Sequence, residues 1–362
     1  MNKLDAIFLF SISYWWLIMN ILPVVIDLNP FIFLGLREVW VVLFLLIIIA
    51  RKNLKLIKIY VLAVILFACI SLALNINQFN GFIFYYGFRD MLFIATIPYL
   101  LSLKVEKKTV KNFIHVVFLL ATIQIVLSFI LSNDQLLNLL KINEYYESKG
   151  VKSNVYGGIT GIRLIFPFYS SGLLGMFFTL SFLFFKGRKR IISTVFALLT
   201  ASKVAIMVPG LYLIRKSKIL LTSVLIFIFI VFPAGIEYAL KNVEVGFWSF
   251  HLSSIKDRFS ILDTFNLNRL SFQPDLLGTN SVAGYVLSGR DPSLAPESLI
   301  IARGLDFQLY FPFFVLLLLL LINSLKGKTQ HIFTILLITL IFTNLSNHPI
   351  AFIPLLLIKN DE

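Results

Sequence analysis

The residues with the greatest chemical potential in this sequence are arginines, because an apolar chain has little reason to carry charge where they lie. The chain is 59% hydrophobic and 14% charged. Seven arginines lie outside its lysine-rich clusters: Arg37, Arg89, Arg163, Arg258, Arg269, Arg290 and Arg303. A guanidinium is a planar fork that binds phosphate bidentately, whereas a lysine ammonium acts as a point charge. These arginines therefore predict a ligand that carries phosphate.

Acidic residues that are expected on the same side of the membrane as these arginines provide the alternative explanation for each arginine. They are Glu144, Glu147, Glu237, Glu244, Asp257, Asp263, Asp275, Asp291, Glu297 and Asp306. An ion pair with one of them would neutralise an arginine without any ligand. For a single arginine the two explanations stay open at this point.

Three cations have the most informative positions. Arg163 opens an apolar run in GIRLIFPFYSSGLLG, and Lys203 separates two short apolar runs in LLTASKVAIMV. A cation at the centre of a bilayer costs about 2.5–3.5 kcal/mol, so Lys203 is expected at the outer surface or in an ion pair. The alternative for Lys203 is a lysine that extends from a helix end to the interface.

Arg258 lies in the stretch HLSSIKDRFSILDTF. Leu252, Ile255, Phe259 and Leu262 recur at helical spacing, which predicts an amphipathic helix on the membrane surface. Arg258 falls between its apolar and polar faces, at the level of lipid phosphates. It is either a phosphate ligand or an ordinary interfacial arginine.

Other kinds of chemistry find little support in the sequence. The four histidines are scattered without the spacing of metal ligands, and carboxylates do not cluster as a metal site requires. A phosphate-binding glycine loop and a serine nucleophile motif are also absent. The sequence therefore predicts no cofactor and no metal, and leaves positioning, cationic stabilisation and one general base as the available chemistry.

These residues must be held by membrane-spanning helices, since apolar runs long enough to cross a bilayer recur along the chain. The expected fold is all-α, a polytopic transmembrane bundle of about 11–12 spans in a single domain, residues 1–362. The first run is expected to be a span rather than a cleaved signal peptide. The expected spans lie near 6–26, 36–50, 57–75, 84–103, 112–132, 163–185, 191–201, 203–214, 219–237, 304–323, 331–345 and 349–358. The regions 191–214 and 331–358 each fit two short helices or one kinked helix.

The lysine-rich clusters predict the orientation of these spans. Clusters begin at Arg51, Lys104, Lys186, Arg215 and Lys326, and they alternate with segments that lack them. By the positive-inside rule the clusters and both termini are cytoplasmic, and two long loops, 132–162 and 238–303, face outward. A net charge of +14 distributed in this way encodes topology and argues against a nucleic-acid partner. A lipid-linked diphosphate at the outer leaflet is then the expected ligand of the outer arginines.

Five stretches resemble, in order and spacing, the motifs of a known family. They are GIRLIFPFYSSGLLG, LLTASKVAIMV, KDRFSIL, LLGTN and APESLI, within about residues 155–325. The chain is similar to the bacterial O-antigen and capsular polysaccharide polymerases (Wzy type), which share a superfamily with the O-antigen ligases. Lys203 departs from the arginine usual in that family, and Gln308 from the usual glycine.

The resemblance implies an inner-membrane enzyme that moves a growing glycan from undecaprenyl diphosphate to the non-reducing end of a lipid-linked repeat unit. Arg163, Lys203 and Arg258 are the expected diphosphate ligands, with Arg290 and Arg303 next. Glu297 is the candidate general base and His251 the second candidate. For Glu297 the alternative is an acid at a helix start or a partner of Arg303.

The implied partners are undecaprenyl diphosphate-linked oligosaccharides, the lipid bilayer, a chain-length regulator and a flippase. Two alternative functions stay open. One is the O-antigen ligase, although Pro296, Glu297 and Ser298 stand where ligases commonly have a histidine. The other is a flippase or transporter of lipid-linked oligosaccharides, although charge concentrates in one outer loop and no repeated halves are evident.

Overall fold

The structure, a computed structural model, describes residues 3–28, 33–51, 53–147, 163–200, 271–280, 284, 299–342 and 348–361. In these ranges every regular element is a helix and no strand occurs. The all-α fold predicted from the sequence is confirmed for this part of the chain.

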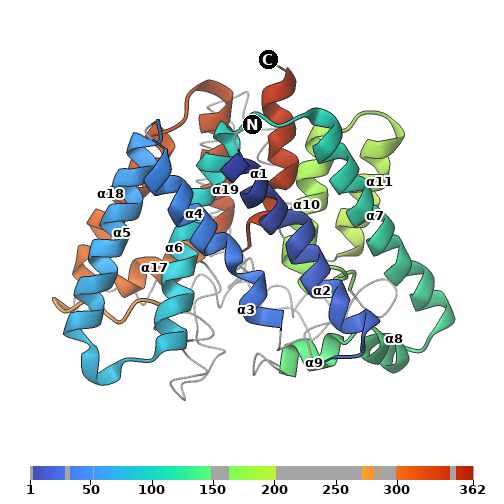
Figure 1. Ribbon diagram of the computed structural model, residues 1–362, viewed down its shortest axis with the longest axis horizontal. Coiled ribbons are helices and arrows are strands. Elements are labelled where there is room, and N and C mark those ends of the chain that lie inside the picture. The colour runs from blue at the N-terminus through green and yellow to red at the C-terminus, as the bar shows by residue number, and fades with distance from the viewer. Residues whose placement is uncertain are drawn as a thin grey trace, which may run out of the picture.

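Within each described range the helices follow one another with short connections (Figure 1). Up to residue 147 they are α1 (Lys3–Phe10), the π-helix η1 (Ser11–Trp15), α2 (Trp16–Val25), α3 (Leu34–Arg37), α4 (Val39–Ala50), α5 (Lys55–Leu74), the 3-10 helix η3 (Ile76–Gln78), α6 (Gly81–Ser102), α7 (Lys107–Ile130), α8 (Asn133–Leu139) and α9 (Ile142–Glu147). After residue 162 they are α10 (Ser171–Phe184), α11 (Arg188–Leu199), α17 (Leu299–Asp306), the 3-10 helix η7 (Gln308–Tyr310), α18 (Phe311–Asn323), α19 (Gly327–Phe342) and the 3-10 helix η8 (Pro349–Asp361).

Three of the described helices are long and apolar enough to cross a membrane: Lys3–Val25, α5 and α7. The helices Ser171–Phe184 and Gln308–Asn323 are apolar but shorter. On α7, Leu119 is 64% exposed and Phe129 is 79% exposed, and on α5 Leu62 is 64% exposed. Apolar side chains pointing out of a bundle are typical of a surface covered by lipid. The membrane character of the chain is therefore supported, whereas the number of spans stays a prediction.

The connections α4–α5, α6–α7, α10–α11 and α18–α19 lie at the end of the bundle that also holds both ends of the chain (Figure 1). These connections are the ones that carry the lysine-rich clusters, including Lys55, Lys104, Lys186 and Lys326. At this end Arg51 pairs with Asp5, whose other oxygen accepts a hydrogen bond from Tyr99 Oη at 2.6 Å. The first helix is thereby attached to α4 and α6.

The helix η8 occupies the middle of the bundle, where it contacts α6, α7, α10 and η1. Every residue from Ile350 to Leu357 is buried. A helix that is apolar on all sides lies either among other helices or in lipid, and η8 lies among other helices. The structure also answers the question left open at 331–358, because α19 and η8 are two separate helices.

The segment 163–170 differs from the expected span at 163–185. The helix α10 begins only at Ser171, and Leu164, Ile165, Phe166 and Phe168 are buried without being helical. The peptide bond before Pro167 is cis, and a proline has no N–H with which to continue a helix. The pattern of apolar residues could not distinguish this buried non-helical segment from the first turns of a helix.

Gln124 of α7 provides hydrogen bonds for this segment. Its Oε1 accepts from the N–H groups of Ile165 at 3.0 Å and Phe166 at 2.8 Å, and its Nε2 donates to the Arg163 carbonyl at 2.9 Å. Backbone groups at membrane depth have no water to bind, so buried non-helical chain needs such partners. The side chain of Gln124 therefore fixes the start of this segment.

We expect Gln124→Leu to lower the free energy of unfolding by about 1–3 kcal/mol per backbone group left unsatisfied. Thermal unfolding of the detergent-solubilised protein measures the effect. Thr122→Val is the matched control on the same helix, because the exposed Thr122 hydroxyl donates only within α7. Equal unfolding temperatures for both variants would contradict this role of Gln124.

Candidate functional site

Arg303 is the predicted ligand residue whose surroundings the structure describes most completely. It lies in α17, and its side chain is 0% exposed. Its Nη1 is 2.7 Å from Asp306 Oδ2 in the same helix, and its Nε is 3.7 Å from Asp90 Oδ2 in α6. Arg303 therefore lies between two buried carboxylates.

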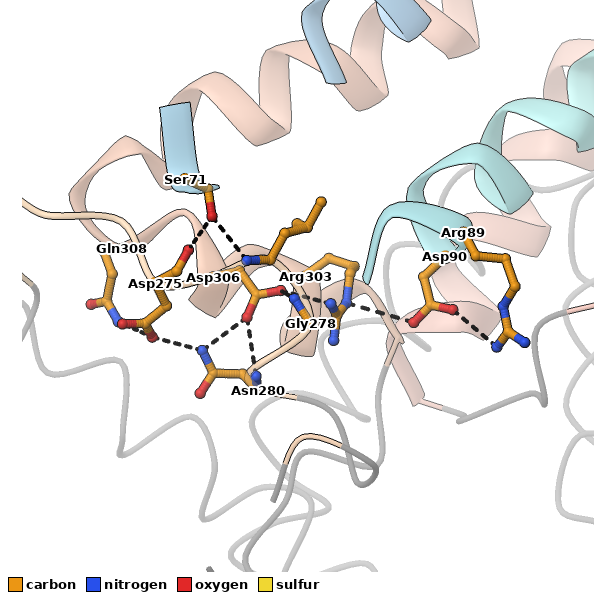
Figure 2. Close-up of polar contacts among 10 residues, drawn as sticks. Ser71, Arg89, Asp90, Asp275, Gly278, Asn280, Arg303, Asp306 and Gln308 are labelled. Carbon is orange, nitrogen blue, oxygen red and sulfur yellow. Dashed lines mark hydrogen bonds and ion pairs between the residues drawn. The ribbon is translucent and has the colours of Figure 1, made fainter. Parts of the chain in front are cut away.

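The alternation of charges continues beyond Asp90 (Figure 2). Arg89 Nη2 lies 3.4 Å from the other Asp90 oxygen, and Arg89 Nη1 lies 2.8 Å from Glu38 Oε1. The second Glu38 oxygen accepts a hydrogen bond from Trp40 Nε1 at 3.0 Å. We call the series Glu38, Arg89, Asp90, Arg303 and Asp306 the ion chain; it joins the α3–α4 junction, α6 and α17.

Burial explains why the ion chain alternates in sign. The side chain of Arg89 is 14% exposed and that of Asp90 is 5% exposed. An isolated charge in such surroundings is costly, and removing one member of a buried pair leaves an uncompensated charge. Each charge is therefore held beside one of opposite sign.

The ion chain leaves some guanidinium donors unused. Among the contacts that the structure describes, Nε and Nη2 of Arg303 and Nε of Arg89 donate no hydrogen bond. A guanidinium has five N–H donors, and buried donors normally have partners. Two neighbouring arginines of the ion chain therefore have buried N–H donors without a hydrogen-bond partner among the described residues.

Arg163 lies at the start of the segment 163–170, half-buried, and its backbone carbonyl is bound by Gln124. Its buried Nε donates no hydrogen bond to any residue that the structure describes. The predicted ligand residues Arg163 and Arg303 thus each keep at least one donor available. No contact between Arg163 and Arg303 is present in the described part of the chain.

His348 is a buried residue that sequence reasoning did not single out. Its ring stacks on Trp16 with centroids 4.6 Å apart and meets the edge of Trp40 at 5.7 Å. Its Nδ1 accepts a hydrogen bond from the Ile350 N–H at 3.2 Å, so the imidazole caps η8. Arg37 and Arg89 lie close enough to act electrostatically on the ring. A lone histidine before Pro349 gave no signal of this arrangement.

The remaining predicted site residues, Lys203, Arg258, Arg290, Glu297 and His251, lie outside the described residues. So do the region 201–270 and residues 148–162 of the predicted loop 132–162. Their proposed roles stay predictions. The described ranges contain no group of three or more residues able to hold a metal ion.

Asp306 is the acid that pairs with Arg303, which is the kind of pairing that the sequence left open as the alternative for each arginine. The role of Arg303 as a phosphate ligand stays a prediction beside this pairing. Sequence reasoning placed Arg37 and Arg89 in the outer arginine set but did not select them. The available signal was the apolar sequence around them, VW after Arg37 and Glu38, and YYGF before Arg89.

Comparison with known proteins finds no matching family model, no matching curated protein and no matching solved structure. The family resemblance of the sequence motifs therefore stays a prediction.

We expect Arg303→Ala to destabilise the protein by about 3–5 kcal/mol, because Asp306 loses its closest cation while it stays buried in an apolar bundle. Thermal unfolding in detergent measures the loss. Arg188→Ala removes an exposed arginine at the α10–α11 connection and should stay within about 0.5 kcal/mol of the unchanged protein. A stable Arg303→Ala variant would show that the Arg303–Asp306 pair is not a structural necessity.

Proposed function

We propose that the chain is a polymerase of surface polysaccharide in the bacterial inner membrane. It transfers a growing glycan from undecaprenyl diphosphate to the non-reducing end of a lipid-linked repeat unit. The observation that carries the proposal is the presence of buried arginines with unused N–H donors inside an apolar helical bundle. Phosphate groups, such as those of a diphosphate, are ligands that guanidinium donors bind bidentately.

The orientation of the bundle supports an outward-facing reaction. The end that carries the lysine-rich connections is cytoplasmic in this proposal, by the positive-inside rule. The helix α6 runs from Gly81 to Ser102 and ends at the connection that contains Lys104. Arg89 is closer to Gly81 than to Ser102, so it lies in the half of α6 that is farther from the lysine-rich end. The arginines of the ion chain then belong to the outer half of the bundle, where the lipid-linked substrate is presented.

The reaction follows from the chemistry of the leaving group. The bond between the anomeric carbon of the growing glycan and the diphosphate oxygen breaks, and a bond to the acceptor hydroxyl oxygen forms. The hydroxyl proton passes to a general base, while the diphosphate leaves with the electron pair of the broken bond. Cations placed in advance in a poorly hydrated site stabilise the charge that develops on it.

The predicted residues divide these tasks. Arg163, Lys203 and Arg258 bind the diphosphate, and Arg290 and Arg303 support them. Glu297, or else His251, accepts the hydroxyl proton. The reaction needs no cofactor, and a flippase and a chain-length regulator are the expected protein partners.

A flippase of lipid-linked oligosaccharides is the second candidate, and the ion chain is the observation that favours it. Ionisable residues inside a membrane bundle often line the route of a transported substrate or proton. Three carboxylates and two guanidiniums in one connected series fit such a route.

A deletion strain separates the candidate functions through the banding pattern of its surface polysaccharide. We expect loss of the polymerase to leave a single repeat unit on the lipid A core, because transfer of one unit still proceeds. Polymer retained on its carrier would instead indicate a ligase, and repeat units left on the cytoplasmic face would indicate a flippase. Re-expression of the unchanged chain is the control and should restore the full ladder of bands.

Arg163→Ala and Arg258→Ala should each lower the rate of chain extension by about 10²–10³, the usual cost of losing one group that stabilises developing charge. The polysaccharide ladder measures the loss, and immunoblots of membranes show whether each variant reaches the membrane. Arg188→Ala controls for the removal of an arginine as such. Normal ladders from both variants would exclude these residues from the reaction.

A further inference from the structure

The stretch Ser271–Asn280 is described although most of the outer segment 238–303 is not. We call it the strap. Leu276, Leu277, Gly278 and Asn280 of the strap are buried, so it packs into the bundle rather than lying on its surface. Its sequence QPDLLGTN contains a proline and a glycine, and it forms no regular helix there.

The strap is attached first to the end of α5. The Ser71 hydroxyl donates to the Asp275 carbonyl at 2.7 Å and accepts from the Leu277 N–H at 2.9 Å. One turn later, Asn75 Nδ2 donates to the Pro274 carbonyl at 2.9 Å. One polar side chain of α5 and one of the residue that follows this helix thus bind the backbone of the strap.

The second attachment is the carboxylate of Asp306 (Figure 2). One oxygen accepts from the Gly278 N–H at 2.9 Å, and the other accepts from the Asn280 N–H at 3.1 Å and Asn280 Nδ2 at 3.0 Å. The Asp306 carbonyl also accepts from the Asp275 N–H at 3.0 Å. The N–H groups of Gly278 and Asn280 therefore converge on one buried carboxylate.

The third attachment is a close approach of two glycines. Gly278 has φ +101°, which favours glycine, and its backbone lies against Gly87 of α6. A Cβ on Gly87 would collide with the backbone of Gly278, and its distance to the Leu277 carbonyl carbon would be only 2.5 Å. The strap therefore fits α6 only because both positions lack a side chain.

Asp306 connects these attachments to the ion chain. The carboxylate oxygen that accepts from the Gly278 N–H is also the one 2.7 Å from Arg303 Nη1. The strap carries its own acid, Asp275, whose Oδ2 accepts from Asn280 Nδ2 at 2.9 Å and Gln308 Nε2 at 2.7 Å. The Asp306 carboxylate thus both binds the strap and pairs with Arg303.

We propose that Asp306 is a positioning residue that fastens the strap to α17, in addition to the strap's contacts with α5 and α6, and that chain extension requires the fastened strap. The effect of the strap on chain extension rests on the polymerase function proposed above. The fastening itself does not, because it is a property of the described contacts. Asp306 acts here through the strap and does not touch the reacting groups.

Hydrogen–deuterium exchange of the purified full chain in detergent tests the fastening. We expect Asp306→Asn to speed exchange of the strap amides of Leu277, Gly278 and Asn280 by about tenfold or more, since two amides lose a charged acceptor. Asp134→Asn, at an exposed acid of α8, is the matched control and should leave the strap unchanged. Unchanged strap exchange in Asp306→Asn overturns the proposal.

Two further variants open the strap without changing Asp306. Gly87→Ala displaces it sterically, and Gly35→Ala is the control because a Cβ on Gly35 meets nothing within 4 Å. Asn280→Ala removes the side chain of one strap residue and leaves Asp306 and Gly87 unchanged. This variant is measured in place of Gly87→Ala or Asp306→Asn if either of them does not fold. We expect faster strap exchange in Gly87→Ala and Asn280→Ala, together with shorter polysaccharide ladders.

The two readouts separate the two proposals. A strap that opens in these variants while the ladder stays normal would overturn the requirement for a fastened strap. If a deletion strain keeps its polymer, the polymerase function fails, and the exchange data alone still decide whether Asp306 fastens the strap. Partial recovery of strap protection in Asp306→Glu, which keeps a carboxylate, is the expected rescue; no recovery would count against the fastening role.

Discussion

The pairing of guanidinium and carboxylate groups inside an apolar bundle is the constraint on which this structure depends. Arg303 and Asp306 are both 0% exposed, so neither charge is stable there without the other. Asp90 then links this pair to Arg89, and Arg89 to Glu38. Because these residues belong to α17, α6 and the α3–α4 junction, satisfying the charges also fixes how these elements lie against one another. Buried polar groups can specify a unique arrangement in this way even when they add little stability.

A second constraint concerns backbone that is buried but not helical. In the segment 163–170 and in the strap, polar side chains of neighbouring helices replace the water that a surface loop would use. Gln124 does so for Ile165 and Phe166, and Asn20 Nδ2 donates to the Pro167 carbonyl at 3.1 Å. Ser71 and Asn75 do so for the strap. Polar residues in the apolar helices α2, α5 and α7 are thus explained by the segments that they hold.

Helices could be predicted from the sequence because hydrophobic segments of spanning length are a local property. The expected span 84–103 corresponds to α6, and 57–75 corresponds to α5. The segment 163–170 was misassigned, because its hydrophobicity is that of a helix and the hydrogen bonds that support another conformation come from the distant Gln124 and Asn20. The partners of Arg303 were not predictable in detail, since Asp90 lies far away in the chain and the ten outer acids were equivalent candidates. The environment of His348 was missed for the same reason, because Trp16 and Trp40 come together only in the folded bundle.

The central position of η8 has a consequence for how the chain assembles during synthesis. The elements that surround it, η1, α6, α7 and α10, all precede it in the sequence and leave the ribosome earlier. They are therefore complete before the helix that fills their centre exists. Until η8 arrives, the space between them must be occupied by lipid, by water or by looser packing of their own side chains. The final packing of the core is thus a late step in the synthesis of the chain.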